Sequence, residues 1–151
     1  MSDESVMLLV LSHTCQDVDD PALLAPGEMP ERIARAVDLT GQQRPATKAE
    51  MVRYIIDSLA SGYARTVQQA ASLADIPVEV IHIVGGGSQN ELLCQSTADF
   101  AALPVIAGPV EATALGNVLI QARARGAMPD LLEDMRACVA ECSQLRRYEP
   151  R

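Results

Sequence analysis

The stretch "EVIHIVGGGSQNELLCQSTADF", residues 79–100, decides the fold of this chain. It begins inside an apolar segment, "VEVIHIV" at residues 78–84, that is rich in branched side chains. This composition is typical of a parallel strand that is buried on both faces. Three consecutive glycines follow, and the apolar spacing after them predicts a helix that reaches about residue 100. A strand joined through a tight turn to a helix indicates the α/β class.

A second unit of the same kind follows in the sequence. The segment "PVIAG", residues 104–108, predicts a short strand that leads into a helix over residues 111–125, and a final helix is predicted over residues 130–142. Two parallel strands make a poor sheet, because each needs neighbours at its edges and helices over its faces. We therefore expect residues 1–151 to form a single partial domain with few parallel strands and several helices. Residues 1–16 are the least defined part of it.

Two helices are predicted before these units. A proline suits the first turn of one helix over residues 30–39. Thr47 and Glu50 have the spacing of a capping box, which predicts the start of a long helix that continues to about residue 74.

The composition argues against several classes of partner. Asp and Glu number 20 against 12 Lys and Arg among 151 residues, and the formal net charge of −8 repels nucleic acid and anionic membranes. With no Trp and one Phe, the chain offers no wall of stacked aromatic side chains. The apolar run over residues 6–11 is short and follows acidic residues, where a secretory signal carries positive charge. We expect a cytoplasmic protein that binds neither nucleic acid nor membranes.

The four cysteines are scattered and form no CxxC pair, which predicts free thiols. Cys138 and Cys142 lie four residues apart on a predicted helix. They could offer two metal ligands or belong to a buried stripe of small apolar side chains. No third ligand lies near them in the sequence, so the buried stripe is favoured and we assign no metal site.

The glycine segment, residues 85–87, has two interpretations. It could be a cradle of backbone amides for an anion or a nucleotide, since no side chain keeps a ligand away. It could also be a tight turn where a strand and a helix pack closely. Neither the Walker pattern nor GxGxxG is present. Ser88, Gln89 and Asn90 could each cap the next helix or hydrogen-bond a ligand, and capping is the commoner role.

Other polar residues near these elements give weaker signals. His82, inside the predicted strand, is expected to be packed rather than catalytic, because no partner is placed to form a triad with it. Glu111 is expected to be a first-turn acid favoured by the helix dipole, with a site-lining role as the alternative. Asp99 is expected to be a solvated or capping acid rather than a base. No catalytic residue is assigned.

Four stretches together resemble a known family. "VIHIVGGGSQNELLCQSTAD" at residues 80–99 and "PVIAGPVEATALGNVLIQA" at residues 104–122 resemble the C-terminal domain of the FGGY carbohydrate kinases. "DDPALLAPGEMPERI" at residues 19–33 and "RRYEP" at residues 146–150 are most similar to its rhamnulokinase-like branch. The resemblance begins at about residue 17 and continues to residue 151.

The resemblance implies two actin-like, ribonuclease-H-like domains around a cleft, with ATP bound mainly by the C-terminal one. It implies transfer of the γ-phosphoryl group of MgATP to a ketose hydroxyl, for this branch the 1-hydroxyl of L-rhamnulose. Carried over by motif, Gly85, Gly86 and Gly87 would approach the phosphates and ribose, and Asn90 would lie beside the adenosine. ATP is thus the expected cofactor, with Mg²⁺ carried by the nucleotide.

The resemblance also implies that the catalytic aspartate and the sugar contacts belong to an N-terminal domain. The chain therefore resembles a partial kinase, expected to be inactive alone and to meet its ketose only when that domain is supplied. We also expect weak stability or oligomerisation unless another chain covers the exposed strand edge. The alternatives are a noncatalytic interaction or regulatory protein derived from the same fold and a pseudogene remnant.

Overall fold

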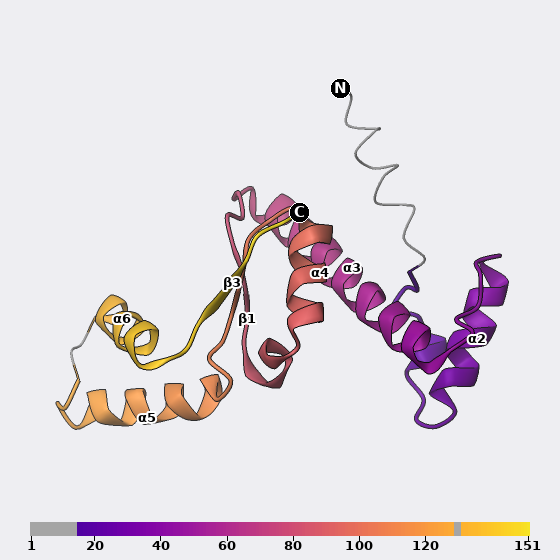
Figure 1. Cartoon of the computed structure of the whole chain (residues 1–151). Coiled ribbons are helices and arrows are strands. Elements are labelled where there is room, and N and C mark those ends of the chain that lie inside the picture. Colours follow the sequence, from indigo (N-terminus) through magenta and orange to yellow (C-terminus); the bar gives the residue numbers. More distant parts are fainter. Residues whose placement is uncertain (1–14, 129–130) are drawn as a thin grey trace. The chain divides into compact units, whose positions relative to one another are not determined.

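The computed structural model describes residues 15–128 and 131–151 (Figure 1). The chain divides after Pro77 into two compact units. We call residues 15–77 the helical unit and residues 78–151 the sheet unit, and each is described by itself. Residues 1–14 lie outside the described part of the chain, so most of the weakly assigned N-terminal segment does too. Whether the two units fold as one domain stays a prediction.

The helical unit contains a short 3-10 helix and two α-helices. They are η1 (Pro21–Leu23), α2 (Met29–Leu39) and α3 (Lys48–Ala74). Both predicted helices are confirmed, with ends within two residues of those expected. Ile33 and Val37 of α2 pack with Tyr54 of α3 in the buried core of this unit. The amphipathic spacing of α2 therefore serves to bury one face against α3.

Local signals fix the start of α3. The Thr47 hydroxyl accepts a hydrogen bond from the Glu50 backbone N–H at 3.1 Å, and the Glu50 carboxylate accepts one from the Thr47 N–H at 3.2 Å. This is the predicted capping box. Farther along α3, a Cβ added at Gly62 would lie 2.7 Å from Val18 Cγ2. The glycine in mid-helix thus lets the segment before α2 pack against α3.

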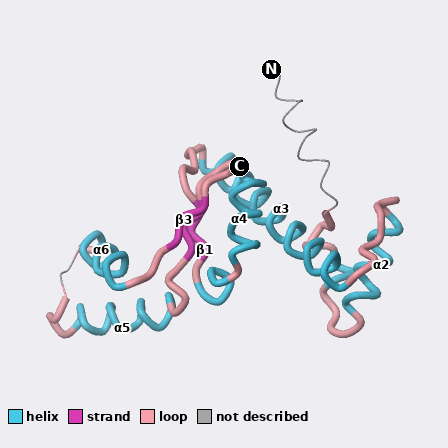
Figure 2. The backbone as a smooth tube through the Cα atoms, in the orientation of Figure 1, coloured by secondary structure: helices cyan, strands magenta, loops and turns pink. Residues whose placement is uncertain are grey.

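The sheet unit holds three short strands and four helices among its described residues (Figure 2). The strands are β1 (Ile81–Ile83), β2 (Val105–Ala107) and β3 (Arg146–Tyr148). The helices are η2 (Gly85–Gln89), α4 (Glu91–Ala101), α5 (Ala112–Ala124) and α6 (Leu132–Cys142). β2 lies in the centre of the sheet, parallel to β1 and antiparallel to β3.

The core of the sheet unit lies between α4 and one face of the sheet. Cys94 and Ala98 of α4 pack against Val105 and Ala107 of β2, and all four are buried. Ile81, Ile83 and Tyr148 complete this core from the two outer strands. Because side chains alternate along a strand, His82, Ile106 and Arg147 share the opposite face.

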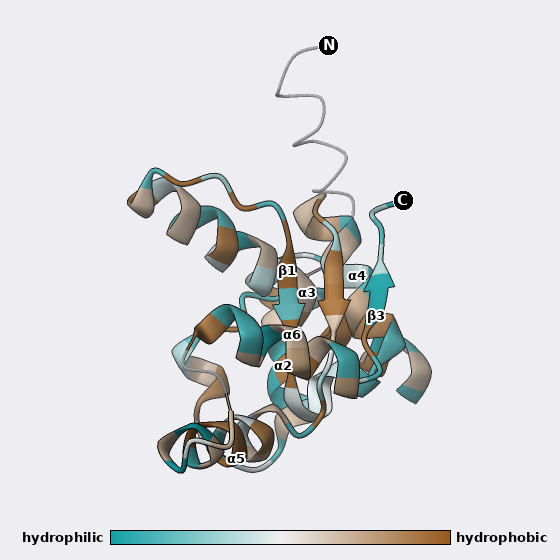
Figure 3. Cartoon of the chain, turned by 90° about the vertical axis from the view of Figure 1, so that its left-hand side faces the viewer, coloured by the Kyte–Doolittle hydropathy of each residue, from teal (hydrophilic) through white to brown (hydrophobic). Residues whose placement is uncertain are grey.

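Two expectations about the sheet are wrong. The strand predicted over residues 78–84 is only three residues long. It is also not buried on both faces, because His82 and Val84 are exposed. The strand β3 and its antiparallel pairing were also not predicted. Figure 3 shows why, since β3 is hydrophilic, and its two arginines gave no strand signal. The α/β class is confirmed, and the actin-like arrangement stays a prediction.

The cysteines also differ from the expectation. Cys142 is exposed and Cys138 is only half-buried, so they form no buried stripe. Their sulfur atoms lie 4.0 Å apart, and within residues 15–128 and 131–151 no cluster of three or more potential ligands could hold a metal ion. The same part of the chain contains no helix long and apolar enough to span a membrane.

Candidate functional site

The two motif loops meet where β1 and β2 end. The Gly85 backbone N–H donates to the Pro109 carbonyl at 3.0 Å, and the Gly108 N–H donates to the Ile83 carbonyl at 2.8 Å. Because β1 and β2 are parallel, their carboxyl ends lie at the same edge of the sheet. The structure thus brings together two segments that are more than twenty residues apart in the sequence. Ligands of parallel sheets commonly bind at such an edge.

The glycine segment forms a 3-10 helix rather than an open loop. Its three glycines differ in what the fold requires of them. Gly85 has φ +76°, a conformation that favours glycine. A Cβ at Gly87 would make only an ordinary contact, 3.8 Å from Ile83 Cγ2, and a Cβ at Gly86 would meet no atom within 4 Å. Neither backbone strain nor close packing within the described residues explains the glycine at position 86.

Asn90 caps α4, as the commoner of its two interpretations predicts. Its Oδ1 accepts a hydrogen bond from the Leu93 N–H at 3.0 Å. The Ser88 hydroxyl is also used within the segment, because it donates to the Gly85 carbonyl at 2.6 Å. These two side chains therefore shape the glycine segment from both ends. Gln89 is exposed and carries no capping role.

The thiol of Cys94 in α4 contacts the backbone of the glycine segment. Burial raises the pKa of this thiol, with a further contribution from the charge of Glu91. The thiol sulfur lies 3.9 Å from the Gly87 carbonyl oxygen and 3.8 Å from that of Ser88. A protonated, fully buried thiol in this position is a weak donor to the backbone and a poor nucleophile.

The remaining sequence candidates lie elsewhere. His82 is exposed, so the expectation that it is packed is wrong. Its side chain was expected inside a packed two-sided layer, but it borders a cavity that α5 and α6 also line. Glu111 precedes α5 as an exposed N-cap residue without a capping hydrogen bond, so it is not in the first turn. Asp99 is exposed and accepts from the Gln95 amide at 2.9 Å and the Arg151 N–H at 3.0 Å, as a solvated structural acid.

Two cavities adjoin the strand ends. The polar cavity, about 240 Å³, is lined by Ser88, Gln89, Ala107, Gly108, Val110, Gln144 and Arg146. The apolar cavity, about 750 Å³, lies on the other face of the sheet, where α5 and α6 contribute most of its walls. Its lining includes His82, Val84, Leu119, Met135 and Val139. The glycine segment contributes directly to the polar cavity.

The chain matches a known family over most of its length. Residues 10–125 match the C-terminal domain of the FGGY family of carbohydrate kinases. This chain belongs to that family. The glycine segment and the loop after β2 both fall inside the matched region, whereas Gln144 and Arg146 of the polar cavity lie beyond it.

The curated relatives of this FGGY chain include several rhamnulokinases. That of Bacteroides thetaiotaomicron is 39% identical over 132 residues, which cover 87% of this chain and 27% of the relative. That of Pectobacterium atrosepticum is 41% identical over 133 residues, 88% of this chain and 27% of the relative. That of Enterococcus faecalis is 43% identical over 117 residues, which cover 76% of this chain and 24% of the relative. The chain thus spans about a quarter of the length of the curated relatives it matches.

Sequence reasoning did not place Gln144 and Arg146 in the site of this FGGY chain. They enter the polar cavity through β3, whose register sets Arg146 opposite Ala107 at the end of β2. The "RRYEP" motif was noticed only as a mark of resemblance. Its two adjacent arginines give no apolar alternation, so the sequence held no clear signal for this short edge strand.

Proposed function

We propose that this chain is the nucleotide-binding part of an ATP-dependent sugar kinase that phosphorylates a ketose such as L-rhamnulose. The family membership and the rhamnulokinase relatives support the reaction class and the sugar. The proposed site is the glycine segment, with Gly85, Gly86 and Gly87 facing the nucleotide and Asn90 beside it.

Gly86 is the observation that carries this proposal. A Cβ at this position would meet nothing within 4 Å, and its φ is not in the left-handed region. Glycine in an element that does not need it weakens the element by about 0.5–1 kcal/mol relative to alanine. A ligand that approaches the backbone closely gives this residue a purpose. The position of Gly86 at the carboxyl ends of two parallel strands is where such a ligand is expected.

The residues around the segment fit a nucleotide. The polar cavity beside it offers a hydroxyl, two amides and a guanidinium group, which together can donate to and accept from a polar ligand. In this proposal Mg²⁺ arrives bound to the phosphates of the nucleotide, and no residue of this chain is assigned to hold it. The strongly acidic chain would then hold the nucleotide through local groups.

In the proposed reaction, MgATP supplies the γ-phosphoryl group and a ketose hydroxyl accepts it. The contribution of this chain is to bind and orient the nucleotide, because positioning is a large part of phosphoryl-transfer catalysis. No residue of this chain is assigned as the base that takes the proton from the hydroxyl. General base catalysis typically contributes about a hundred- to ten-thousandfold. We therefore expect residues 1–151 alone to bind nucleotide without measurable phosphotransfer.

The unpaired outer edge of β1 is an argument that a complementing chain is a partner of this protein. In the described parts of the sheet unit, β2 pairs with one edge of β1 and no strand pairs with the other. An unpaired edge is a template for a further strand. Light scattering of the purified chain, with and without a separately produced kinase N-terminal domain, measures whether it self-associates or joins that domain.

Calorimetric titration with MgADP and MgATP tests the nucleotide site. The unaltered chain should bind both saturably, and Gly86→Val should weaken binding at least about tenfold, equivalent to 1.4 kcal/mol, since a branched side chain would occupy the approach. Gln68→Val, at an exposed position of α3, is the matched control and should bind normally. Unchanged affinity in Gly86→Val would show that the nucleotide does not approach this glycine. A folded chain that binds no nucleotide would favour the noncatalytic interaction role.

A further inference from the structure

Cys138 and Cys142 of α6 form a pair of thiols that the proposed function leaves without a role. Their sulfur atoms lie 4.0 Å apart. Both cysteines are free, and Cys138 is half-buried while Cys142 is exposed. The other two free cysteines differ, since Cys94 is fully buried and Cys15 belongs to the helical unit. The pair, which we call the dithiol, is therefore open to solvent at Cys142.

The helix itself brings these two thiols together. Residues four positions apart lie on one face of a helix, and their side chains lean toward its N-terminus. The Cys142 side chain therefore extends over the turn that carries Cys138. Each position along a helix turns the side chain by about 100°, so a thiol one position later would point away from Cys138.

The spacing of the dithiol suits a bridging metal ion better than a disulfide. Cβ atoms four positions apart on a helix are separated by about 5–6 Å, whereas a disulfide needs them within about 3.5–4.5 Å. A disulfide would therefore distort the end of α6. Two metal–sulfur bonds of about 2.3 Å each can span up to about 4.6 Å. One ion thus fits between the two sulfur atoms at their observed separation of 4.0 Å.

The ligands decide which kind of ion fits. Structural zinc takes four ligands, and calcium and magnesium take several oxygen ligands. In the part of the chain that the structure describes, no third His, Cys, Asp or Glu joins the dithiol in a metal-binding cluster. Thiolates are soft ligands and select monovalent copper, which forms stable complexes with only two sulfur ligands. Cu(I) is therefore the ion that matches the dithiol.

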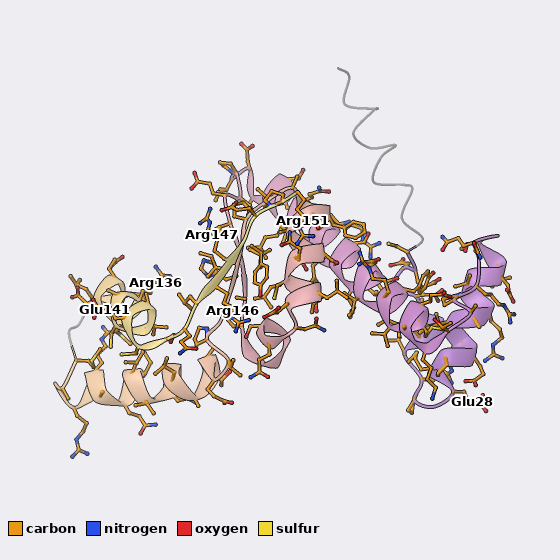
Figure 4. All side chains as sticks on the ribbon, in the orientation of Figure 1. Glu28, Arg136, Glu141, Arg146, Arg147 and Arg151 are labelled. Atoms are coloured by element: carbon orange, nitrogen blue, oxygen red, sulfur yellow. The ribbon has the colours of Figure 1, made fainter. Side chains whose placement is uncertain are left out.

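The charged residues around the dithiol favour a cation. Asp134 lies four positions before Cys138 and Glu141 lies three positions after it, so both acids neighbour this thiol on the surface of α6. Arg136 instead lies on the side of α6 that lines the apolar cavity. Figure 4 labels Arg136 and Glu141 on α6. The two acids lower the energy of a positive ion bound at Cys138.

We propose that Cys138 and Cys142 bind one Cu(I) ion as a bridging dithiolate across the last turn of α6. Binding forms two copper–sulfur bonds and breaks two S–H bonds, and both protons pass to the solvent. The copper stays monovalent, so no oxidant or reductant is consumed. The dithiol lines neither the polar cavity nor the glycine segment, and the inference does not depend on nucleotide binding.

Competition with the coloured Cu(I) chelator bathocuproine disulfonate measures the affinity. The titration is run without oxygen, so that the thiols stay reduced. The unaltered chain should bind one Cu(I) per chain. Cys138→Ser and Cys142→Ser should each weaken binding at least about a hundredfold, because the second thiolate acts at the high effective concentration of a chelate. Cys15→Ala removes a thiol outside the pair and should bind normally. Unchanged affinity in both serine variants would overturn the proposal.

A shifted thiol separates the geometry of the pair from the number of cysteines. The double variant Cys142→Ser with Ser143→Cys keeps four cysteines and moves one thiol by a single position. It should bind Cu(I) as weakly as Cys142→Ser alone. Binding as tight as in the unaltered chain would overturn the proposal, because the shared helix face would then not matter. Zn²⁺ should bind the unaltered chain at least about a hundredfold more weakly than Cu(I), and equal affinities would contradict the assignment of the ion.

Protection from alkylation tests the site without any variant. Bound Cu(I) should protect Cys138 and Cys142 from iodoacetamide, as located by mass spectrometry, and should leave the reactivity of Cys15 unchanged. Light scattering should show that the copper-loaded chain has the same size as the free chain. Protection of Cys142 alone, or one ion shared by two chains, would show that copper joins chains rather than two positions of α6. Either result would overturn the proposal.

Discussion

The start of α3 in the helical unit and the last strand of the sheet unit are fixed by interactions of different range. In the helical unit, the bonds that start α3 join residues three positions apart. In the sheet unit, α4 holds the end of the chain through residues one turn apart. Glu91 pairs with Arg146, Gln95 donates to the Glu149 carbonyl at 2.8 Å, and Asp99 accepts from the Arg151 N–H at 3.0 Å.

The range of these interactions determines where a binding site can form in such a chain. A helix fixed by neighbours in the sequence presents a single continuous surface. A sheet fixed by distant partners brings separate loops to one edge, as Gly85 and Pro109 show. The candidate site lies in the sheet unit because the long-range pairing gathers its polar groups there. Replacements of matched residues in the two units test this contrast.

The largest effect is expected where the sheet unit depends on close backbone approach. Gly108→Ala would force a side chain into φ +110° and to within 3.2 Å of the Gln144 carbonyl oxygen. Strain and overpacking together should lower the free energy of unfolding by about 3 kcal/mol. Gly86→Ala, where a Cβ meets nothing within 4 Å, should instead raise it by about 0.5–1 kcal/mol. Urea unfolding measures both, and equal effects would contradict the geometry.

The next effect compares the two cores. Val37 of α2 and Val105 of β2 are both fully buried. Replacing either by alanine removes two methyl groups and leaves a cavity, which should cost about 2 kcal/mol. If the units unfold independently, each variant should shift only its own thermal transition, followed by circular dichroism. A single transition that both variants shift equally would instead show one cooperative domain, as the sequence analysis expected.

A smaller effect compares the two helix caps. Thr47→Ala and Asn90→Ala each remove a side-chain acceptor from a helix start, which typically costs about 1 kcal/mol. The nucleotide should distinguish them, because Asn90 lies in the proposed site and Thr47 does not. Asn90→Ser keeps a cap and removes the amide. Normal stability with weakened MgADP binding in Asn90→Ser would separate the two roles, whereas normal binding would leave Asn90 with the cap alone.

The sequence predicted the helical unit well, because its signals are local. The capping box of Thr47 and Glu50 predicted the start of α3, and the apolar spacing predicted its observed end at Ala74. The two parallel strands and the glycine segment were also located. The strand lengths were overestimated, because branched residues indicate a preference for extended backbone but not how many partners the sheet provides.

The rest of the site could not be predicted from local patterns. Arg146 reaches the polar cavity only because β3 pairs with β2, some forty positions earlier in the sequence. A hydrophilic edge strand of three residues has no apolar alternation to reveal it. The burial of His82 was predicted wrongly for a related reason. It depended on whether helices pack against the face of β1 that carries this side chain. The open space beside Gly86 could likewise not be predicted, because it depends on how distant segments pack around this residue.

The smallest expected effect is the pH dependence that Cys15 gives to the helical unit. Burial, with a contribution from the nearby charge of Asp57, raises the pKa of this thiol from 9.0 to about 11. The unfolded thiol therefore ionises at lower pH than the folded one. The stabilisation from the protonated thiol is fully present below about pH 9 and is lost as the pH rises through about 11.

Cys15→Ala isolates this contribution from the other groups that titrate at high pH. The difference in urea midpoint between the unaltered chain and Cys15→Ala should be constant from pH 7 to 8.5 and should shrink by pH 10.5. The change is expected to be small, because the thiol is only half-buried and water screens its charge. A constant difference across the whole range would show that Cys15 is as accessible to solvent in the folded helical unit as in the unfolded chain. The Gln16 N–H donates a hydrogen bond to the Ser58 hydroxyl of α3 at 2.9 Å. The packing of residues 15–20 against α3, which includes this bond, would then not persist in solution.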